Sequence, residues 1–200
     1  MSKELEAARA LVKMLEEREN AGMVELATLN PGEVFKVGEH DFIVLEQQDG
    51  ETAIISKGFM VERVVFDDDT KDYNESSLKR LIESEIQPII EAAVGAENII
   101  EHNVDLTSVD MQNEFGSCCC KVRPITFDEA KKYNDLLVNT ELPRWWWTCT
   151  PWSTEERGWK YLLVVVSPVG DFNRSNCYSI IGVRPFCILK SNIFVSRGEV

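Results

Sequence analysis

The sequence has little of what most enzymes use for catalysis. It contains two histidines, His40 and His102, and each stands in a polar stretch away from any Ser or Cys nucleophile motif. It has no phosphate-cradling glycine loop, no His-Glu-x-x-His motif and no Cys-x-x-Cys pair. Acidic pairs such as Glu155-Glu156 are typical of exposed charges, because a general acid needs a carboxyl group in an apolar pocket. We therefore expect a protein that is not an enzyme.

Positive charge and long apolar runs are also scarce. The chain carries 21 Lys and Arg against 34 Asp and Glu, a net charge of −13. Because nucleic-acid binding needs clustered Lys and Arg, we expect no nucleic-acid partner. No apolar run approaches the length of a membrane span, so we expect no membrane insertion. The charged start, Met1-Ser2-Lys3-Glu4, is unlike a signal peptide, so we expect synthesis and folding in a cytosol.

The six cysteines lack the spacing of a zinc site or a disulfide framework. Cys118, Cys119 and Cys120 are consecutive, and a strand points neighbouring side chains to opposite faces. We expect free thiols, with Cys119 facing away from the other two. The run Asp67-Asp68-Asp69 could hold calcium, but such loops are usually only solvated. We expect neither a metal nor a cofactor.

Residues 1–28 predict an N-terminal helix. Leu5, Ala8, Val12 and Leu15 are spaced three and four apart, as in a heptad seam. At about two heptads the seam is too short for a stable isolated coiled coil. Two interpretations stay open: the helix packs on its own domain, or it forms a homo-oligomer or joins a longer assembly.

Residues 29–200 predict one domain of the α+β class. It begins at the turn Leu29-Asn30-Pro31-Gly32. The alternating segments Val34 to Val37, Phe42 to Glu46 and Ala53 to Ser56 predict an antiparallel meander, and Val61 to Phe66 predicts another strand.

Two or three helices complete this prediction. One begins at Leu78, is interrupted near Pro88 and resumes through Ile90 to Val94. Another begins at Thr126, where Glu129 completes a capping box. The remainder is short strands and a long irregular C-terminal region.

Four of the five tryptophans fall within eight residues, from Trp145 to Trp152. If this block is a strand, Trp146 faces one way and Trp145 and Trp147 face the other, so that they can fill the core. We expect Trp152 and Trp159 to reach the ligand side instead.

From Tyr161 to Leu189 the chain contains no Lys, Glu, Gln, Met or Trp, although these types make up 48 of the 200 residues. An asparagine codon randomised at its two adenines can never encode those five types. The segment Phe172 to Ile181 lies wholly within the set that it can encode, and has no period of 2 or 3.6. This is the composition that adenine-directed diversification would leave.

Four motifs follow one another in the C-terminal part: Trp145-Trp146-Trp147, Thr150-Pro151-Trp152-Ser153-Thr154, Val166-Ser167-Pro168-Val169-Gly170 and Gly182-Val183-Arg184-Pro185-Phe186-Cys187-Ile188. Together they resemble an uncharacterised bacterial and phage domain family with Trp-Trp-Leu-Arg-Ser-Pro and Gly-Val-Arg-Pro signatures. Many of its members resemble the variable proteins of diversity-generating retroelements. The resemblance covers residues 29–196 and departs from the pattern at Thr148-Cys149, where Leu-Arg or Leu-Ala is usual.

The resemblance implies a C-type-lectin-like fold and a ligand-binding or phage-tropism function. In such systems a reverse transcriptase copies a template RNA with errors at adenines and rewrites the 3′ end of the gene. The implied variable region is residues 145–190, in a protein of phage or bacterial origin, and association with a virion stays open. The resemblance further implies that Arg184 is a buried guanidinium that binds loop carbonyls.

The predicted ligand-binding residues combine the variable segment with the aromatic block: Thr148, Cys149, Trp152, Trp159, Tyr161, Phe172, Asn173, Arg174, Ser175, Asn176, Cys177, Tyr178, Ser179, Ile180 and Ile181. Of these, Tyr161, Phe172, Tyr178, Ile180 and Ile181 would form an apolar patch, with Arg174 as a polar handle. Such a patch favours a protein ligand or cell-surface receptor over a sugar.

Two other functions remain as alternatives. A structural or assembly domain of a phage particle would bury the same segment in a subunit contact. A calcium-dependent carbohydrate binder is disfavoured, because the Glu-Pro-Asn and Trp-Asn-Asp motifs of that class are absent.

Overall fold

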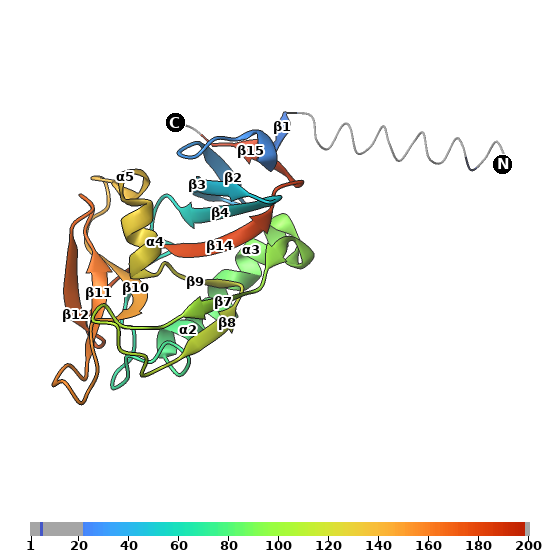
Figure 1. Cartoon of the computed structure of the whole chain (residues 1–200). Helices are drawn as coiled ribbons and strands as arrows, with labels where there is room; N and C mark the ends of the chain where they lie inside the picture. The colour runs from blue at the N-terminus through green and yellow to red at the C-terminus, as the bar shows by residue number, and fades with distance from the viewer. Residues whose placement is uncertain (1–4, 6–21, 199–200) are drawn as a thin grey trace.

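The computed structural model describes Leu5 and residues 22–198 (Figure 1). The described chain combines mostly antiparallel strands with a few short helices, which confirms the predicted α+β class. The predicted heptad seam falls outside the described residues, apart from Leu5. Within the described part, no helix is long and apolar enough to span a membrane.

An eight-stranded sheet forms one side of the fold. Its order is β1-β15-β2-β3-β4-β14-β6, and β9 also pairs with β14. The strands are β1 (Met23–Glu25), β2 (Val34–Val37), β3 (His40–Gln48), β4 (Glu51–Ser56), β6 (Ile99–Ile100), β9 (Val122–Pro124), β14 (Pro185–Lys190) and β15 (Phe194–Arg197). Strands β2, β3 and β4 form the predicted antiparallel meander.

The predicted domain boundary after residue 28 falls inside this sheet. Strand β1 pairs with β15, and the short helix η1 (Leu26–Thr28) buries Leu26 in the core. Residues 23–28 therefore belong to the domain, because long-range pairing with the C-terminal strand recruits them.

A five-stranded sheet carries most of the aromatic block. Its order is β12-β11-β10-β13-β5, and only the β10–β13 pair is parallel. The strands are β5 (Val61–Val64), β10 (Trp146–Pro151), β11 (Leu162–Val166), β12 (Phe172–Asn176) and β13 (Ile181–Val183). The two edges are β12 and β5, and β12 lies at the outer side of the molecule in Figure 1.

The helices and a two-stranded ribbon cover the sheets. The ribbon pairs β7 (His102–Asp105) with β8 (Ser117–Cys120). The helical segments are α2 (Ser77–Leu81), η2 (Ile82–Ile86), α3 (Gln87–Val94), η3 (Ala96–Asn98), α4 (Phe127–Lys132) and α5 (Asn134–Leu137).

The predicted break near Pro88 is absent, because α2, η2 and α3 run on without a gap. Pro88 occupies the first turn of α3, directly after the π-helical segment η2. Inside a continuous helix proline removes one backbone donor and crowds the preceding turn, and here that turn is the π-helical segment η2. The predicted capping box of Thr126 and Glu129 is confirmed at the start of α4.

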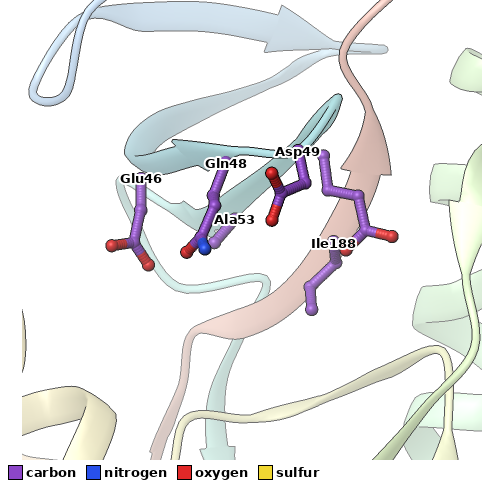
Figure 2. A pocket seen from close by; sticks show the side chains of 6 residues that line it. Glu46, Gln48, Asp49, Ala53 and Ile188 are labelled. Atoms are coloured by element: carbon purple, nitrogen blue, oxygen red, sulfur yellow. The ribbon is translucent and has the colours of Figure 1, made fainter.

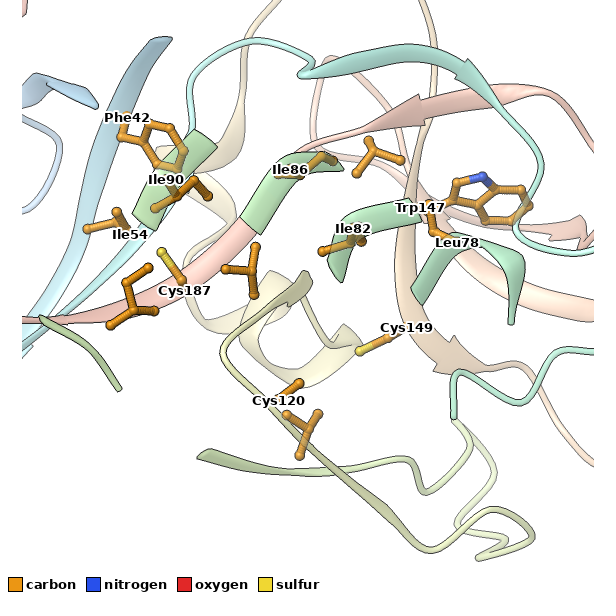
Figure 3. Packing of buried hydrophobic residues seen from close by; sticks show 14 of the residues in the cluster. Phe42, Ile54, Leu78, Ile82, Ile86, Ile90, Cys120, Trp147, Cys149 and Cys187 are labelled. Atoms are coloured by element: carbon orange, nitrogen blue, oxygen red, sulfur yellow. The ribbon is translucent and has the colours of Figure 1, made fainter. Parts of the chain in front are cut away.

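Two apolar clusters fill the interior. The larger one packs the α2–η2–α3 segment against both sheets and includes Ile82, Ile90 and Trp147 (Figure 3). The smaller one packs α4 and α5 against the opposite faces and includes Trp146. All six cysteines are free thiols; Cys119 is exposed whereas Cys118 and Cys120 are buried, as the alternation predicted.

Candidate functional site

The tryptophan block forms the centre of the scaffold. Trp146 and Trp147 are both fully buried but belong to different clusters, so strand alternation sends them to opposite faces of β10. Trp147 Nε1 donates a hydrogen bond to the Val64 carbonyl at 3.1 Å. Trp145 packs against the same cluster as Trp147 and is half-buried. The predicted division of these three side chains is confirmed.

The Gly-Val-Arg-Pro motif is also scaffold. Arg184 is buried, and it donates from Nε to the Ser56 carbonyl and from one Nη to the Leu137 carbonyl, both at 2.8 Å. Burial without a carboxylate partner lowers its pKa to about 9. A Cβ at Gly182 would lie 2.6 Å from the Phe59 ring, so only glycine fits there unless the ring moves. The predicted buried role of Arg184 is confirmed.

Three predicted ligand-binding residues lie in the core. Thr148, Cys149 and Cys177 are fully buried. The Thr148 hydroxyl donates to the Val164 carbonyl at 2.8 Å, and the Cys177 N–H donates to the Tyr161 carbonyl at 2.7 Å. These residues cannot contact a ligand in this fold, because the pairing of β10 and the end of β12 turns their side chains inward.

The predicted apolar patch does not form as one unit. Phe172 packs edge-on against Phe127, with ring centroids 5.0 Å apart, and contacts the smaller core cluster. Tyr161 and Tyr178 form a separate aromatic pair at 5.8 Å beyond the other end of β12. Ile180 is 52% exposed, whereas Ile181 packs against the larger cluster.

Arg174 lies against both of the tryptophans that were predicted to reach the ligand side. Its guanidinium carbon is 5.2 Å from the ring centroid of Trp152 and 5.2 Å from that of Trp159. Trp159 is 39% exposed and Trp152 is half-buried. We call these three side chains the tryptophan–arginine cluster.

Strand β12 presents its other side chains to a shallow depression. Asn173, Ser175, Ile181, Trp145 and Val165 line this space of about 250 Å³, together with Arg174. Asn173 and Arg174, which are neighbours on opposite faces of β12, are both exposed. The turn after β12 continues this surface, closed by a 2.8 Å hydrogen bond from the Ser179 N–H to the Asn176 carbonyl. We call β12, the turn 177–180 and the loop 152–160 together the β12 edge.

No sequence pattern pointed to the residue that holds this loop. Lys71 is buried, and its amine donates to the carbonyls of Ser153 and Trp159. Burial lowers its pKa, and the nearby Glu114 opposes this shift. A lysine beside a run of aspartates is typical of a solvated loop, so its burial could not be predicted.

Asp110 holds the same loop from the other side. It accepts hydrogen bonds from the hydroxyls of Ser108 and Ser153 and forms an ion pair with Arg157. The two hydroxyls and then the guanidinium hold its pKa at about 2. The loop that carries Trp159 is therefore pinned at both ends.

A larger depression, of about 430 Å³, lies away from the β12 edge, beside β7 and α4. The buried Arg123 binds both carboxylate oxygens of Glu129, and its Nε donates to His102 Nε2 at 3.0 Å. His102 Nδ1 lies 3.2 Å from the Ile100 carbonyl. Both ring nitrogens are engaged, so this arrangement anchors α4 rather than presenting a free base.

A third depression, of about 220 Å³, lies on the larger sheet and is lined by Glu46, Gln48, Asp49, Glu51, Ala53 and Ile188 (Figure 2). Hydrogen bonds from Lys132 and Tyr133 occupy Glu46 and lower its pKa. The described residues contain no group of three or more His, Cys, Asp or Glu side chains placed to hold a metal ion. We assign no site here.

Comparisons with family models, with curated proteins and with solved structures found no match to this chain.

Proposed function

We propose that this protein is a non-enzymatic ligand-binding protein with a C-type-lectin-like fold, and that the β12 edge is its ligand-binding surface. We further propose that a diversity-generating retroelement diversifies this surface. The protein would serve receptor recognition, with a protein ligand rather than a sugar.

One observation carries the proposal: three motif residues are buried, whereas four residues of the variable segment are exposed. The motif residues Trp146, Gly182 and Arg184 are buried and each has a specific packing or hydrogen-bonding reason. By contrast, Asn173, Arg174, Tyr178 and Ile180 in the segment Phe172 to Ile181 are exposed. A rigid scaffold that displays varied side chains is the arrangement that a diversified binding protein needs.

The backbone at this edge favours recognition by side chains over strand addition. The hydrogen-bonded pairs Ser167–Asp171 and Cys177–Tyr161 leave the N–H of Arg174 pointing away from β11. That N–H donates to the Asn173 side chain at 2.8 Å, so a strand arriving from a partner would have to displace Asn173. Capping of this kind protects an edge strand from unspecific pairing.

The DNA beside this gene provides the test. We expect a reverse-transcriptase gene and a near-copy of the codons for residues 145–190, differing from the gene only where the copy carries adenines. We expect the mismatches at codons of exposed residues such as Asn173, Arg174 and Tyr178, and matching codons for Trp146, Trp147 and Arg184. If no such repeat exists, diversification is excluded.

A phage assembly domain is the second candidate, favoured by the exposed apolar side chains Tyr178 and Ile180 at a sheet edge. For that function the β12 edge would be buried between copies. Light scattering of wild type and of an Ile180→Asp variant separates the two, because only an assembly contact would be broken by the charge.

A further inference from the structure

We infer that the β12 edge recognises a protein segment that presents a single carboxylate, and that Arg174 is the side chain that binds it. This inference rests on the proposed function and names the chemistry of its ligand.

The position of Arg174 is set by aromatic contacts rather than by charge. Its guanidinium carbon lies 5.2 Å from each of two tryptophan rings. These cation–π contacts place the guanidinium beside both rings, and its five N–H donors form no hydrogen bond among the described residues. The two rings therefore restrain the guanidinium, and its N–H donors remain available for a ligand.

Arg174 has no neutralising anion among the residues that the structure describes. Within Leu5 and residues 22–198 its guanidinium forms no ion pair and no hydrogen bond, although the chain has 34 acidic residues. Two cations of the adjoining loop are paired: Arg157 with Asp110 at 2.7 Å, and Lys160 with Asp69 at 3.5 Å. Arg174 is thus an exposed, restrained and uncompensated cation.

The surrounding loop is pre-organised, which lowers the entropy cost of binding. Lys71 is buried to hold the carbonyls of Ser153 and Trp159, which flank the loop on either side. Burying an ammonium group costs free energy. Here the buried ammonium of Lys71 holds a surface loop in place. Trp159 is consequently held against Arg174 before any ligand arrives.

The remaining features define the ligand. A carboxylate matches the fork of guanidinium donors with two parallel hydrogen bonds. A net charge of −13 would repel a polyanion at long range, so the ligand carries an isolated acidic group. Tyr178 and Ile180, exposed by 50% and 52%, favour apolar side chains beside that group, as in a protein segment.

The test uses a phage-displayed library of random twelve-residue peptides, selected on the full chain. Peptides whose binding is lost on Tyr178→Ala are assigned to the β12 edge. We expect each to contain an Asp or Glu whose change to Asn or Gln weakens binding about tenfold or more. Arg174→Gln should cause the same loss, with no further loss when both changes are combined.

Arg63 provides the matched control. It is an exposed arginine on β5, the opposite edge of the same sheet. Arg63→Gln should leave peptide binding unchanged. Arg174→Glu should shift the selection toward peptides that carry Lys or Arg in place of the acid.

Three outcomes would contradict the inference, and they can be told apart. If edge-binding peptides need no acid, or bind Arg174→Gln as tightly as wild type, the inference is wrong while the proposed function stands. If free N-acetylneuraminate displaces the peptides at lower concentration than acidic peptides do, the carboxylate comes from a glycan, and the choice of a protein segment is wrong. If no peptide maps to the β12 edge, the proposed function fails with the inference.

Discussion

The buried amine of Lys71 donates a 2.7 Å hydrogen bond to the backbone carbonyl of Trp159, 88 residues further along the chain. This bond ties the loop after β5 to the loop that bears the exposed tryptophan. The Lys71 side chain therefore joins the core of the domain to the candidate binding surface.

Replacing Lys71 by Met should loosen that connection. The carbonyls of Ser153 and Trp159 would lose their donor, and we expect a loss of about 1–3 kcal/mol in the free energy of unfolding. Tryptophan fluorescence should also shift, because Trp159 would no longer be held. Urea unfolding measures the first effect, with the exposed Lys190→Met as control; equal losses in both variants would contradict the anchoring role.

Substitutions on the β12 edge should leave stability nearly unchanged, whereas matched core substitutions should not. We expect Ile180→Ala to change the free energy of unfolding by less than about 0.5 kcal/mol, because this side chain is 52% exposed. Ile82→Ala, at a fully buried position, should cost about 2–5 kcal/mol. A loss of several kcal/mol for Ile180→Ala would show that the edge is structural.

Ionised Asp67 should stabilise the fold, so that the free energy of unfolding falls in acid. Burial opposes its ionisation, but hydrogen bonds from Asp69, Ser77 and Thr70 outweigh burial and lower its pKa to about 2 from 3.8. Because the folded-state pKa is the lower one, this contribution is complete above about pH 4 and is lost as the pH falls toward 2.

The expected contribution of Asp67 is about 1–2 kcal/mol. At pH 6 the Asp67→Asn variant should lack this contribution and be less stable than wild type. At pH 2 the difference in the free energy of unfolding between the two proteins should be smaller. The exposed neighbour Asp68→Asn is the control. A difference independent of pH would contradict the assignment.

His102 should make the free energy of unfolding depend on pH a second time, closer to neutral pH. Burial, and then the charge of Arg123, lower its pKa below 6.5. Protonation would also abolish the hydrogen bond that Nε2 accepts from Arg123. Since the unfolded state gains the proton first, stability should be complete above about pH 7 and fall as the pH drops through 6.5.

Thermal unfolding between pH 5 and 7.5 measures this effect. His102→Gln should flatten the slope in that range, whereas His40→Gln should leave it as in wild type. If the His102→Gln variant keeps the wild-type slope of stability against pH, His102 does not cause the pH dependence.

Part of the scaffold could be predicted, because some of its elements depend on neighbours in sequence. The β2–β3–β4 meander follows from alternation and turn residues, and the start of α4 follows from the Thr126 capping box. The opposite burial of Trp146 and Trp147 follows from the two-residue period of a strand.

Only part of the candidate site could be predicted in this way. Trp152, Trp159 and Arg174 were foreseen as surface residues, but nothing in the sequence indicated that they meet. The departure from the family pattern placed Thr148 and Cys149 at the surface, and the composition of the variable segment placed Cys177 there. Both predictions were wrong, because neither kind of evidence records which way a side chain faces.

Local periodicity and side-chain chemistry were enough to predict the α+β class, the free thiols and the strand alternation, whereas the burial of Arg184 was expected only from the family resemblance. Tertiary structure alone decided that β12 is an edge strand, that β1 joins the sheet through β15, and that Lys71 is buried against the carbonyl of Trp159. Strand order and loop docking arise from contacts between distant segments, whose energies no short stretch of sequence contains.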